Sequence, residues 1–210
     1  MLKIFMDGGP LMYPLLICSI ISLTVIIDRT IFWVRVDINR NLSVADEVLD
    51  LCRRGDWEEI RLLTSGSKNS VIRIMVSGIL HREFSMTKAM EAAAGDEIKR
   101  MRRFMGILDT VITVAPLLGI LGTVVGIILS FEALGASGIE HPQVVAAGIG
   151  QALITTATGL GIAILTVFPY NYYNSSIENA VLIIEKYTTS LEIVYEKITQ
   201  AGSESKGLNT

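Results

Sequence analysis

The chain has 210 residues, half of them hydrophobic, and a formal net charge of −3 at pH 7. A soluble domain of this size is also about half apolar, so composition alone does not identify the class, and the small net charge gives no indication of a nucleic-acid partner. Cys18 lies in an apolar segment and Cys52 in a charged one, so the two cysteines do not suggest a disulfide framework.

The distribution of the apolar residues is more informative than their number. Three segments contain no charged residue: Gly8–Ile27, Thr110–Phe131 and Pro142–Ile177. A helix of about 20 mainly apolar residues crosses a hydrocarbon core of roughly 30 Å. The sequence therefore predicts an all-α membrane protein with three transmembrane helices, at 10–28, 107–131 and 144–169.

The first span follows residues 1–9 and begins with prolines, which the first turn of a helix tolerates because its amides have no helical partner. We expect this helix to end near Asp28–Arg29. Lys3 is the only basic residue before the span, and no small-residue cleavage motif follows it. These features favour a retained anchor over a cleaved signal peptide. The large aliphatic residues indicate a peripheral helix that faces lipid.

Residues 34–106 are polar and are predicted to form a helical domain between spans 1 and 2. Turn signals divide this segment: Gly55 as a helix stop, Asp56 with Glu59 as a capping box, and Ser85 as a candidate N-cap. The expected helices are Val44–Arg54, Trp57–Leu63, Val71–His81 and Met86–Met105.

The basic residues predict the orientation of the chain. They are frequent in 34–106 and end in a cluster just before the second span, whereas the loop 132–143 has none. Because basic loops stay in the cytoplasm, we expect 34–106 inside and both 1–9 and 132–143 outside. The cluster is interpreted as a topology anchor; it consists of Lys99, Arg100, Arg102 and Arg103.

After the third span, an aromatic group at 169–173 suits the membrane interface. A long cytoplasmic C-terminal helix is expected over 170–200, because apolar residues recur there at alternating steps of four and three. This seam consists of Ile177, Val181, Ile184, Thr188, Leu191, Tyr195 and Ile198. It can pack on the chain's own cytoplasmic helices or on a second subunit, and the spacing is compatible with both. Residues 201–210, rich in Gly and Ser, are expected to form a disordered tail.

The sequence contains no arrangement typical of an enzyme. His81 and His141 fall on opposite sides of the membrane in the predicted topology, and no HExxH, CxxC, P-loop or GxSxG motif is present. Asp28 and Asp109 lie at span ends rather than at mid-membrane depth. We therefore expect no catalytic residues, no metal and no cofactor.

Small and hydroxylated residues mark the second and third spans at helical spacing. On the second span they are Pro116, Gly119, Gly122, Thr123, Gly126 and Ser130. On the third they are Gly148, Gln151, Ala152, Thr155, Thr156, Thr158, Gly159 and Ala163. Small residues let helices approach closely, and hydroxyls need a partner in lipid, so we interpret these helices as two walls of a helix assembly. For Thr110, Thr113 and Thr166, a bond to a carbonyl one turn back is the simpler expectation.

Both spans resemble a known family. Residues 112–126, ITVAPLLGILGTVVG, resemble the APLLGLLGTVxG stretch of the MotA/TolQ/ExbB proton-channel family. Residues 148–160, GIGQALITTATGL, are similar to that family's GIxEALxxTAxGL stretch, and 8–14 and 27–29 resemble it as well. MotA proteins have four spans and this chain has three, which indicates the ExbB/TolQ branch.

The resemblance implies a homopentamer in the bacterial inner membrane, with a periplasmic N-terminus, around a dimer of a single-span ExbD/TolR-type partner that brings an aspartate into the pore. TonB- or TolA-like energy transducers and membrane lipid would be further partners. It places Thr123 and Thr156 along the ion path, with Gln151 and Thr155 beside them. The family usually has Glu where this chain has Gln151, and an amide cannot titrate. Helix packing would rest on Pro116, Gly119, Gly122, Gly126, Gly148, Ala152, Gly159 and Ala163.

Two functions follow as hypotheses. The first is a subunit of an ion-driven motor that couples proton or other cation flow to work on a partner, for outer-membrane transport or envelope maintenance. Since no carboxylate lies at mid-membrane depth, the titratable group for a proton path must come from another chain. The second is a non-conducting membrane scaffold for a single-span partner, which Gln151 leaves open. A small-molecule transporter would show repeated halves and broken helices, and the sequence has neither.

Overall fold

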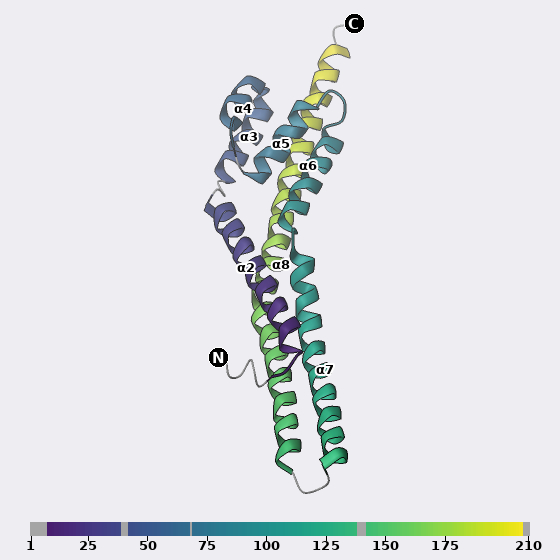
Figure 1. Cartoon of the computed structure of the whole chain (residues 1–210). Coiled ribbons are helices and arrows are strands. Elements are labelled where there is room, and N and C mark those ends of the chain that lie inside the picture. The colour runs from purple at the N-terminus through teal and green to yellow at the C-terminus, as the bar shows by residue number, and fades with distance from the viewer. Residues whose placement is uncertain (1–7, 39–41, 68, 138–141, 208–210) are drawn as a thin grey trace. The chain divides into compact units, whose positions relative to one another are not determined.

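The structure, a computed structural model, describes residues 8–38, 42–67, 69–137 and 142–207. Within these ranges the chain forms helices and no strand, which confirms the all-α fold class (Figure 1). The helices are α2 (Met12–Ile38), α3 (Leu42–Arg54), α4 (Trp57–Thr64), α5 (Ser70–Leu80), α6 (Met86–Met101), α7 (Met105–Ser137) and α8 (Pro142–Gly207). Among the described residues, three helical stretches are long and apolar enough to cross a membrane: Met12–Val36, Met86–Gly135 and Val145–Gln200.

The chain divides into two compact units, and the helices α2 and α8 each contribute to both. Unit 1 consists of Met1–Ile31 and Phe104–Tyr173, and unit 2 consists of Phe32–Arg103 and Asn174–Thr210. Unit 1 contains the apolar stretches of the three predicted spans. Unit 2 contains α3 to α6 and the last part of α8.

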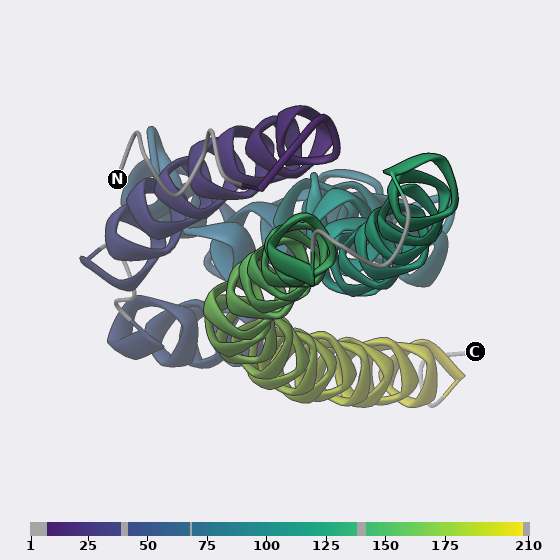
Figure 2. The same cartoon turned by 60° about the horizontal axis from the view of Figure 1, so that its bottom comes forward.

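In unit 1, α2, α7 and α8 pack around a small apolar cluster. Met12 and Leu15 of α2 are buried against Val111 and Ala115 of α7, and Ile162 of α8 packs against the same cluster. Figures 1 and 2 show α7 and α8 running side by side in this unit. The outward faces carry large apolar side chains, which suits contact with lipid because lipid solvates them without cost.

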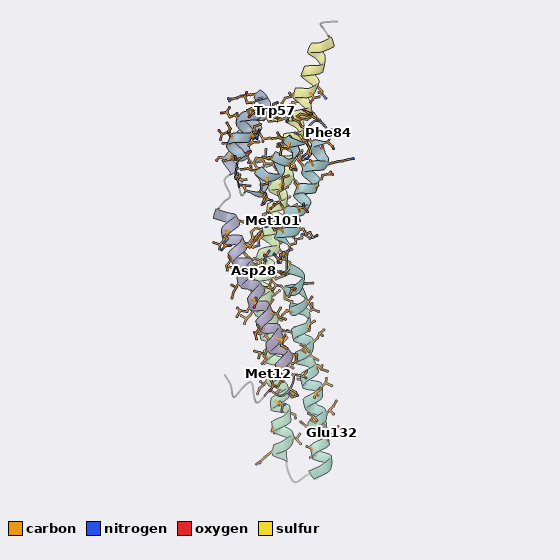
Figure 3. The ribbon with its side chains drawn as sticks, turned by 45° about the horizontal axis from the view of Figure 1, so that its top comes forward. Met12, Asp28, Trp57, Phe84, Met101 and Glu132 are labelled. Carbon is orange, nitrogen blue, oxygen red and sulfur yellow. The ribbon has the colours of Figure 1, made fainter. Side chains whose placement is uncertain are left out.

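In unit 2, the helices bury large side chains as in a water-soluble domain. The fully buried ones include Val48, Ile60, Ile74, Met75, Met90 and Leu191. Within α8, Tyr187 donates a hydrogen bond to Asp46 of α3 at 2.9 Å, and Tyr195 donates one to the carbonyl of Arg82 at 3.1 Å. Arg82 also lies over the ring of Trp57, 4.6 Å from its centre. Trp57 is labelled in Figure 3. Tyr195 of the predicted seam on α8 therefore packs on the chain's own helices.

Several helix ends differ from the predictions. The first helix does not end at Asp28–Arg29 but continues to Ile38, because these two side chains pair with each other and so do not interrupt it. The helix expected over Met86–Met105 ends at Met101, and Phe104, with φ of 65°, precedes α7. Non-glycine residues rarely adopt a positive φ, so a phenylalanine at this position does not predict a break in the helix.

The predicted loop and tail are also shorter than expected. Residues 132–137 belong to α7, and α8 begins at Pro142, so only 138–141 of the loop 132–143 lie outside the described helices. α8 runs through Pro169 without interruption, so the boundary expected between 169 and 170 is not a helix end. The expectation of a disordered tail is wrong for 201–207, which are helical, and 208–210 lie outside the described residues.

The predicted caps have a mixed outcome. Gly55 ends α3 with φ of 79°, as expected for a glycine stop. Asp56 and Ser85 precede α4 and α6, but neither side chain makes a capping hydrogen bond, so the predicted capping box is absent.

Candidate functional site

Glycines bring the backbones of α7 and α8 into close approach. A Cβ atom on Gly119 would lie 3.0 Å from the Cα of Thr156 and 3.3 Å from the carbonyl oxygen of Thr155. A Cβ on Gly159 would collide with the carbonyl oxygen of Ala115. These neighbours are backbone atoms that cannot rotate away, so the two helices meet at this level without intervening side chains.

The close approach extends along both helices. A Cβ on Gly126 would lie 2.8 Å from the Cβ of Ala152, and one on Gly148 would collide with the hydroxyl of Ser130. That hydroxyl donates to the carbonyl of Gly126 at 2.7 Å. Every predicted glycine of this group therefore lies where the other helix leaves little space.

Gly122 also leaves no room for a side chain, because a Cβ there would lie 2.5 Å from the methyl group of the buried Thr155. Ala163 is buried, and Pro116 lies inside α7 without ending it.

Thr156 links α7 and α8 by a hydrogen bond. Its hydroxyl donates to the carbonyl of Gly119 at 2.7 Å. The hydroxyl of Thr123 donates to the carbonyl of Ile120 in its own helix at 2.6 Å. No hydrogen bond joins the Thr123 and Thr156 hydroxyls in the part of the chain that the structure describes. Each hydroxyl keeps lone pairs that can accept a bond from water or an acid.

Thr155 and Gln151 face the turn that precedes α2. Thr155 is 1% exposed, and its hydroxyl lies 2.8 Å from the carbonyl oxygen of Gly8 and 2.9 Å from that of Gln151. Gly9 has φ of 75°, and a Cβ there would overlap the side-chain amide of Gln151. The four expected ion-path residues thus form two pairs with different neighbours: Thr123 and Thr156 lie by the carbonyls of α7, and Gln151 and Thr155 by residues 8 and 9.

The other threonines of these spans bond within their own helices. Thr110, Thr113 and Thr166 donate to the carbonyls of Gly106, Asp109 and Ile162, at 2.8, 3.1 and 2.7 Å. Their expected role in local backbone bonding is confirmed. Thr158 does the same with the carbonyl of Ile154.

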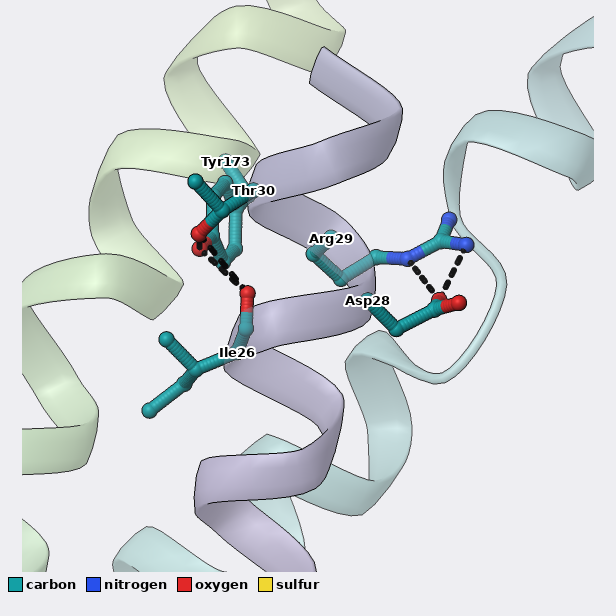
Figure 4. Close-up of polar contacts among 5 residues, drawn as sticks. All are labelled: Ile26, Asp28, Arg29, Thr30 and Tyr173. Carbon is teal, nitrogen blue, oxygen red and sulfur yellow. Dashed lines mark hydrogen bonds and ion pairs between the residues drawn. The ribbon is translucent and has the colours of Figure 1, made fainter. Parts of the chain in front are cut away.

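In unit 1, Asp28 and Arg29 were expected only to mark the end of the first span. Arg29 is only 4% exposed, and its Nε and one terminal nitrogen donate to the same oxygen of Asp28 at 3.0 and 2.7 Å (Figure 4). Its guanidinium also lies 5.7 Å from the ring centre of Phe104. The signal in the sequence was an Asp-Arg pair directly after a charge-free segment, but spacing does not reveal that the arginine is buried.

Beside this pair, two hydroxyls join α2 to α8. The oxygens of Thr30 and Tyr173 lie 2.7 Å apart, and both are within hydrogen-bond distance of the carbonyl of Ile26, at 2.8 and 3.0 Å (Figure 4). Within the described residues, no group of His, Cys, Asp or Glu side chains could hold a metal ion.

Comparison with known proteins gives a consistent result. Residues 65–186 match the model of the MotA/TolQ/ExbB proton channel family. The ExbB-like 1 protein of Synechocystis sp. is 37% identical over 202 residues, which cover 92% of this chain and 78% of that protein. The ExbB-like 3 protein of the same organism is 32% identical over 206 residues, which cover 96% of this chain and 98% of that protein.

A Tol-Pal system protein is also similar. TolQ of Haemophilus influenzae is 43% identical over 84 residues, which cover 40% of this chain and 37% of TolQ. The family match extends over more than half of the chain, and the two Synechocystis relatives align with nearly all of it. This chain therefore belongs to the MotA/TolQ/ExbB proton channel family, in its ExbB/TolQ branch, and is a multi-pass membrane protein.

Proposed function

We propose that this chain lines the ion path of an ion-driven motor in the bacterial inner membrane and couples proton or other cation flow to the movement of a partner protein. The family and the names of the relatives, biopolymer transport and Tol-Pal proteins, support this class. The observation that carries the proposal is the hydrogen bond from Thr156 to Gly119, because it puts a hydroxyl into the contact between two helices whose spans carry no charged side chain.

A threonine cannot carry charge, so the path needs a titratable group from elsewhere. The charge-free segments of this chain supply none. We infer that a single-span partner of the ExbD/TolR type brings an aspartate into a pore. Five copies of this chain would form that pore, as the family resemblance implies. Thr156 donates its own proton to Gly119, so its oxygen can accept a hydrogen bond from a protonated acid.

The topology that fits this function has 1–9 and the 132–143 connection on the periplasmic side. Residues 34–106 and the end of α8 lie in the cytoplasm, in agreement with the basic residues of 34–106. A TonB- or TolA-like transducer would deliver the work at the outer membrane. Gln151 and Thr155 would shape the path indirectly, since their contacts hold the turn at residues 8 and 9.

Valine substitutions test the ion path. Thr→Val keeps the shape of the side chain and removes its hydroxyl, so Thr123→Val with Thr156→Val should abolish ion-driven activity of the complex with its partner while the subunits still assemble. Thr110→Val is the matched control, because Thr110 is exposed and bonds only within its own helix. Ion flux in proteoliposomes gives the readout. Undiminished flux in the double variant would contradict the proposed lining.

A non-conducting scaffold is the second candidate, and one observation favours it. The hydroxyls of Thr123, Thr155 and Thr156 all donate to backbone carbonyls, as they would in a contact built for packing alone. A scaffold would keep its function when an uncoupler collapses the proton gradient. Its valine variants would then lose function only in proportion to lost assembly.

A further inference from the structure

A basic cleft lies where α6 ends in unit 2. It is open to solvent, has a volume of about 870 Å³ and is lined by residues between Gly95 and Arg103. Met101, the last residue of α6, marks this place in Figure 3. Four basic side chains and one carboxylate line the cleft, which leaves three net positive charges: Lys99, Arg100, Arg102 and Arg103 against Asp96.

Two of the basic groups of this cleft are available to a ligand. The side chains of Lys99 and Arg102 are exposed, and neither has a hydrogen bond or ion pair in the part of the chain that the structure describes. The nearby carboxylate of Glu97 does not neutralise them, because it is buried and already accepts bonds from Arg73 at 2.9 Å and Ser70 at 3.0 Å.

The cleft also has room for a ligand. Gly95 contributes no side chain, and a Cβ there would meet nothing within 4 Å. Binding sites for small ligands typically enclose about 300–1,000 Å³. Ile98 adds an apolar surface beside the basic groups.

The position of the cleft along the chain places it near the membrane surface. Arg103 lies two residues before α7, and the charge-free segment Thr110–Phe131 begins five residues into that helix, about 8 Å along its axis at a rise of 1.5 Å per residue. The headgroup layers lie directly outside a hydrocarbon core of roughly 30 Å. Long basic side chains bridge the remaining distance by extending toward the interface.

We propose that this cleft binds the phosphate of an anionic phospholipid headgroup. The proposal goes beyond a topology anchor, because an anchor needs only charge near a span, whereas a cleft of defined volume predicts saturable binding of a headgroup. It is independent of ion conduction, and it uses the proposed topology only to name the cytoplasmic leaflet as the source of the lipid.

Lipid titration of the full-length chain tests the proposal. The chain is reconstituted in phosphatidylcholine nanodiscs with increasing phosphatidylglycerol, and bound lipid is measured by native mass spectrometry together with the thermal unfolding midpoint. Saturable retention of phosphatidylglycerol is expected. Lys99→Gln with Arg102→Gln should weaken retention about thirtyfold, since each basic residue near a membrane surface contributes about fivefold.

Lys88→Gln is the matched control. Lys88 lies on the same helix and is exposed, but it does not line the cleft, so this variant should bind as the parent does. Equal loss in both variants would show general surface attraction and overturn the proposal. Displacement of the lipid by millimolar inorganic phosphate would identify a free-phosphate site instead, and unsaturable binding would also overturn the headgroup site.

Discussion

The two units hold their helices together in opposite ways. In unit 1, α7 and α8 meet through glycines and a hydroxyl bonded to a carbonyl, and the large apolar side chains point outward. In unit 2, large apolar side chains point inward, and the polar bonds of Tyr187, Tyr195 and Glu97 cross between helices.

This difference follows from the solvent on the outside. Water drives apolar side chains inward, at roughly 25 cal/mol per Å² of buried apolar surface. Lipid gives no such drive, so helices in it gain most from close backbone approach and from hydrogen bonds. One chain therefore follows two packing rules, and a helix such as α8 changes from one to the other along its length.

The largest effect is expected from emptying the core of unit 2. Met75 is 0% exposed, so Met75→Ala should lower the free energy of unfolding by about 2–5 kcal/mol. Denaturant unfolding of the full chain in detergent measures this change. Leu62, which is 76% exposed, provides the control, and an equal loss in Leu62→Ala would contradict a water-type core.

A smaller effect is expected from filling space in unit 1. Gly159→Ala places a methyl group against the carbonyl of Ala115 and should cost about 1–3 kcal/mol of stability. Gly161→Ala is the matched control, because a Cβ there meets nothing within 4 Å and alanine favours helix over glycine. Thermal unfolding in detergent compares them. If Gly159→Ala were as stable as Gly161→Ala, close backbone contact would not hold α7 against α8.

The smallest effect is expected for the Cys52 thiol, which tests whether water is excluded from the core of unit 2. Burial raises the pKa of the Cys52 thiol from 9.0 to about 11, and the nearby charge of Arg82 only partly opposes this. At pH 8 the folded chain should therefore hold about one hundredfold less Cys52 thiolate than an unperturbed thiol would. Alkylation by iodoacetamide in a Cys18→Ser background measures it, with the denatured chain as the fast reference.

The raised pKa of Cys52 also predicts how the stability of the folded chain depends on pH. The folded state favours the neutral thiol, whereas the unfolded chain ionises above pH 9. The contribution of Cys52 is therefore intact below pH 9 and is lost as the pH rises toward 11. Fast alkylation of the folded chain at pH 8 would indicate that water reaches this core.

The apolar stretches of the fold were predictable because a segment of about 20 residues without charge is typical of a helix that crosses a membrane. Helix ends were less predictable. Asp28 and Arg29 look like a boundary in sequence, but a pair of opposite charges leaves the helical backbone intact. The break before Phe104 has no glycine or proline to mark it, so only the folded backbone reveals it.

For the candidate site, the sequence predicted which residues share a face of one helix. Helical spacing predicts Gly119 and Gly126 on one side of α7 and pairs Gly122 with Gly126, and all three glycines lie against α8. Thr123, expected on the same side, bonds within its own helix. Spacing within one helix does not say which distant residue lies opposite. The bonds from Thr156 to Gly119 and from Thr155 to Gly8 join residues far apart in sequence, so the division of the polar set into two pairs became visible only in three dimensions.

The Thr156–Gly119 bond also limits how this sequence can change over evolutionary time. A side chain at 119 would push the backbone at 156 away and break the bond, and one at 159 would push the same two helices apart at Ala115. The three positions 119, 156 and 159 therefore cannot drift independently. Among related sequences we expect serine as the main alternative at 156, and a larger residue at 119 or 159 only together with a change at 156 that gives up the hydroxyl.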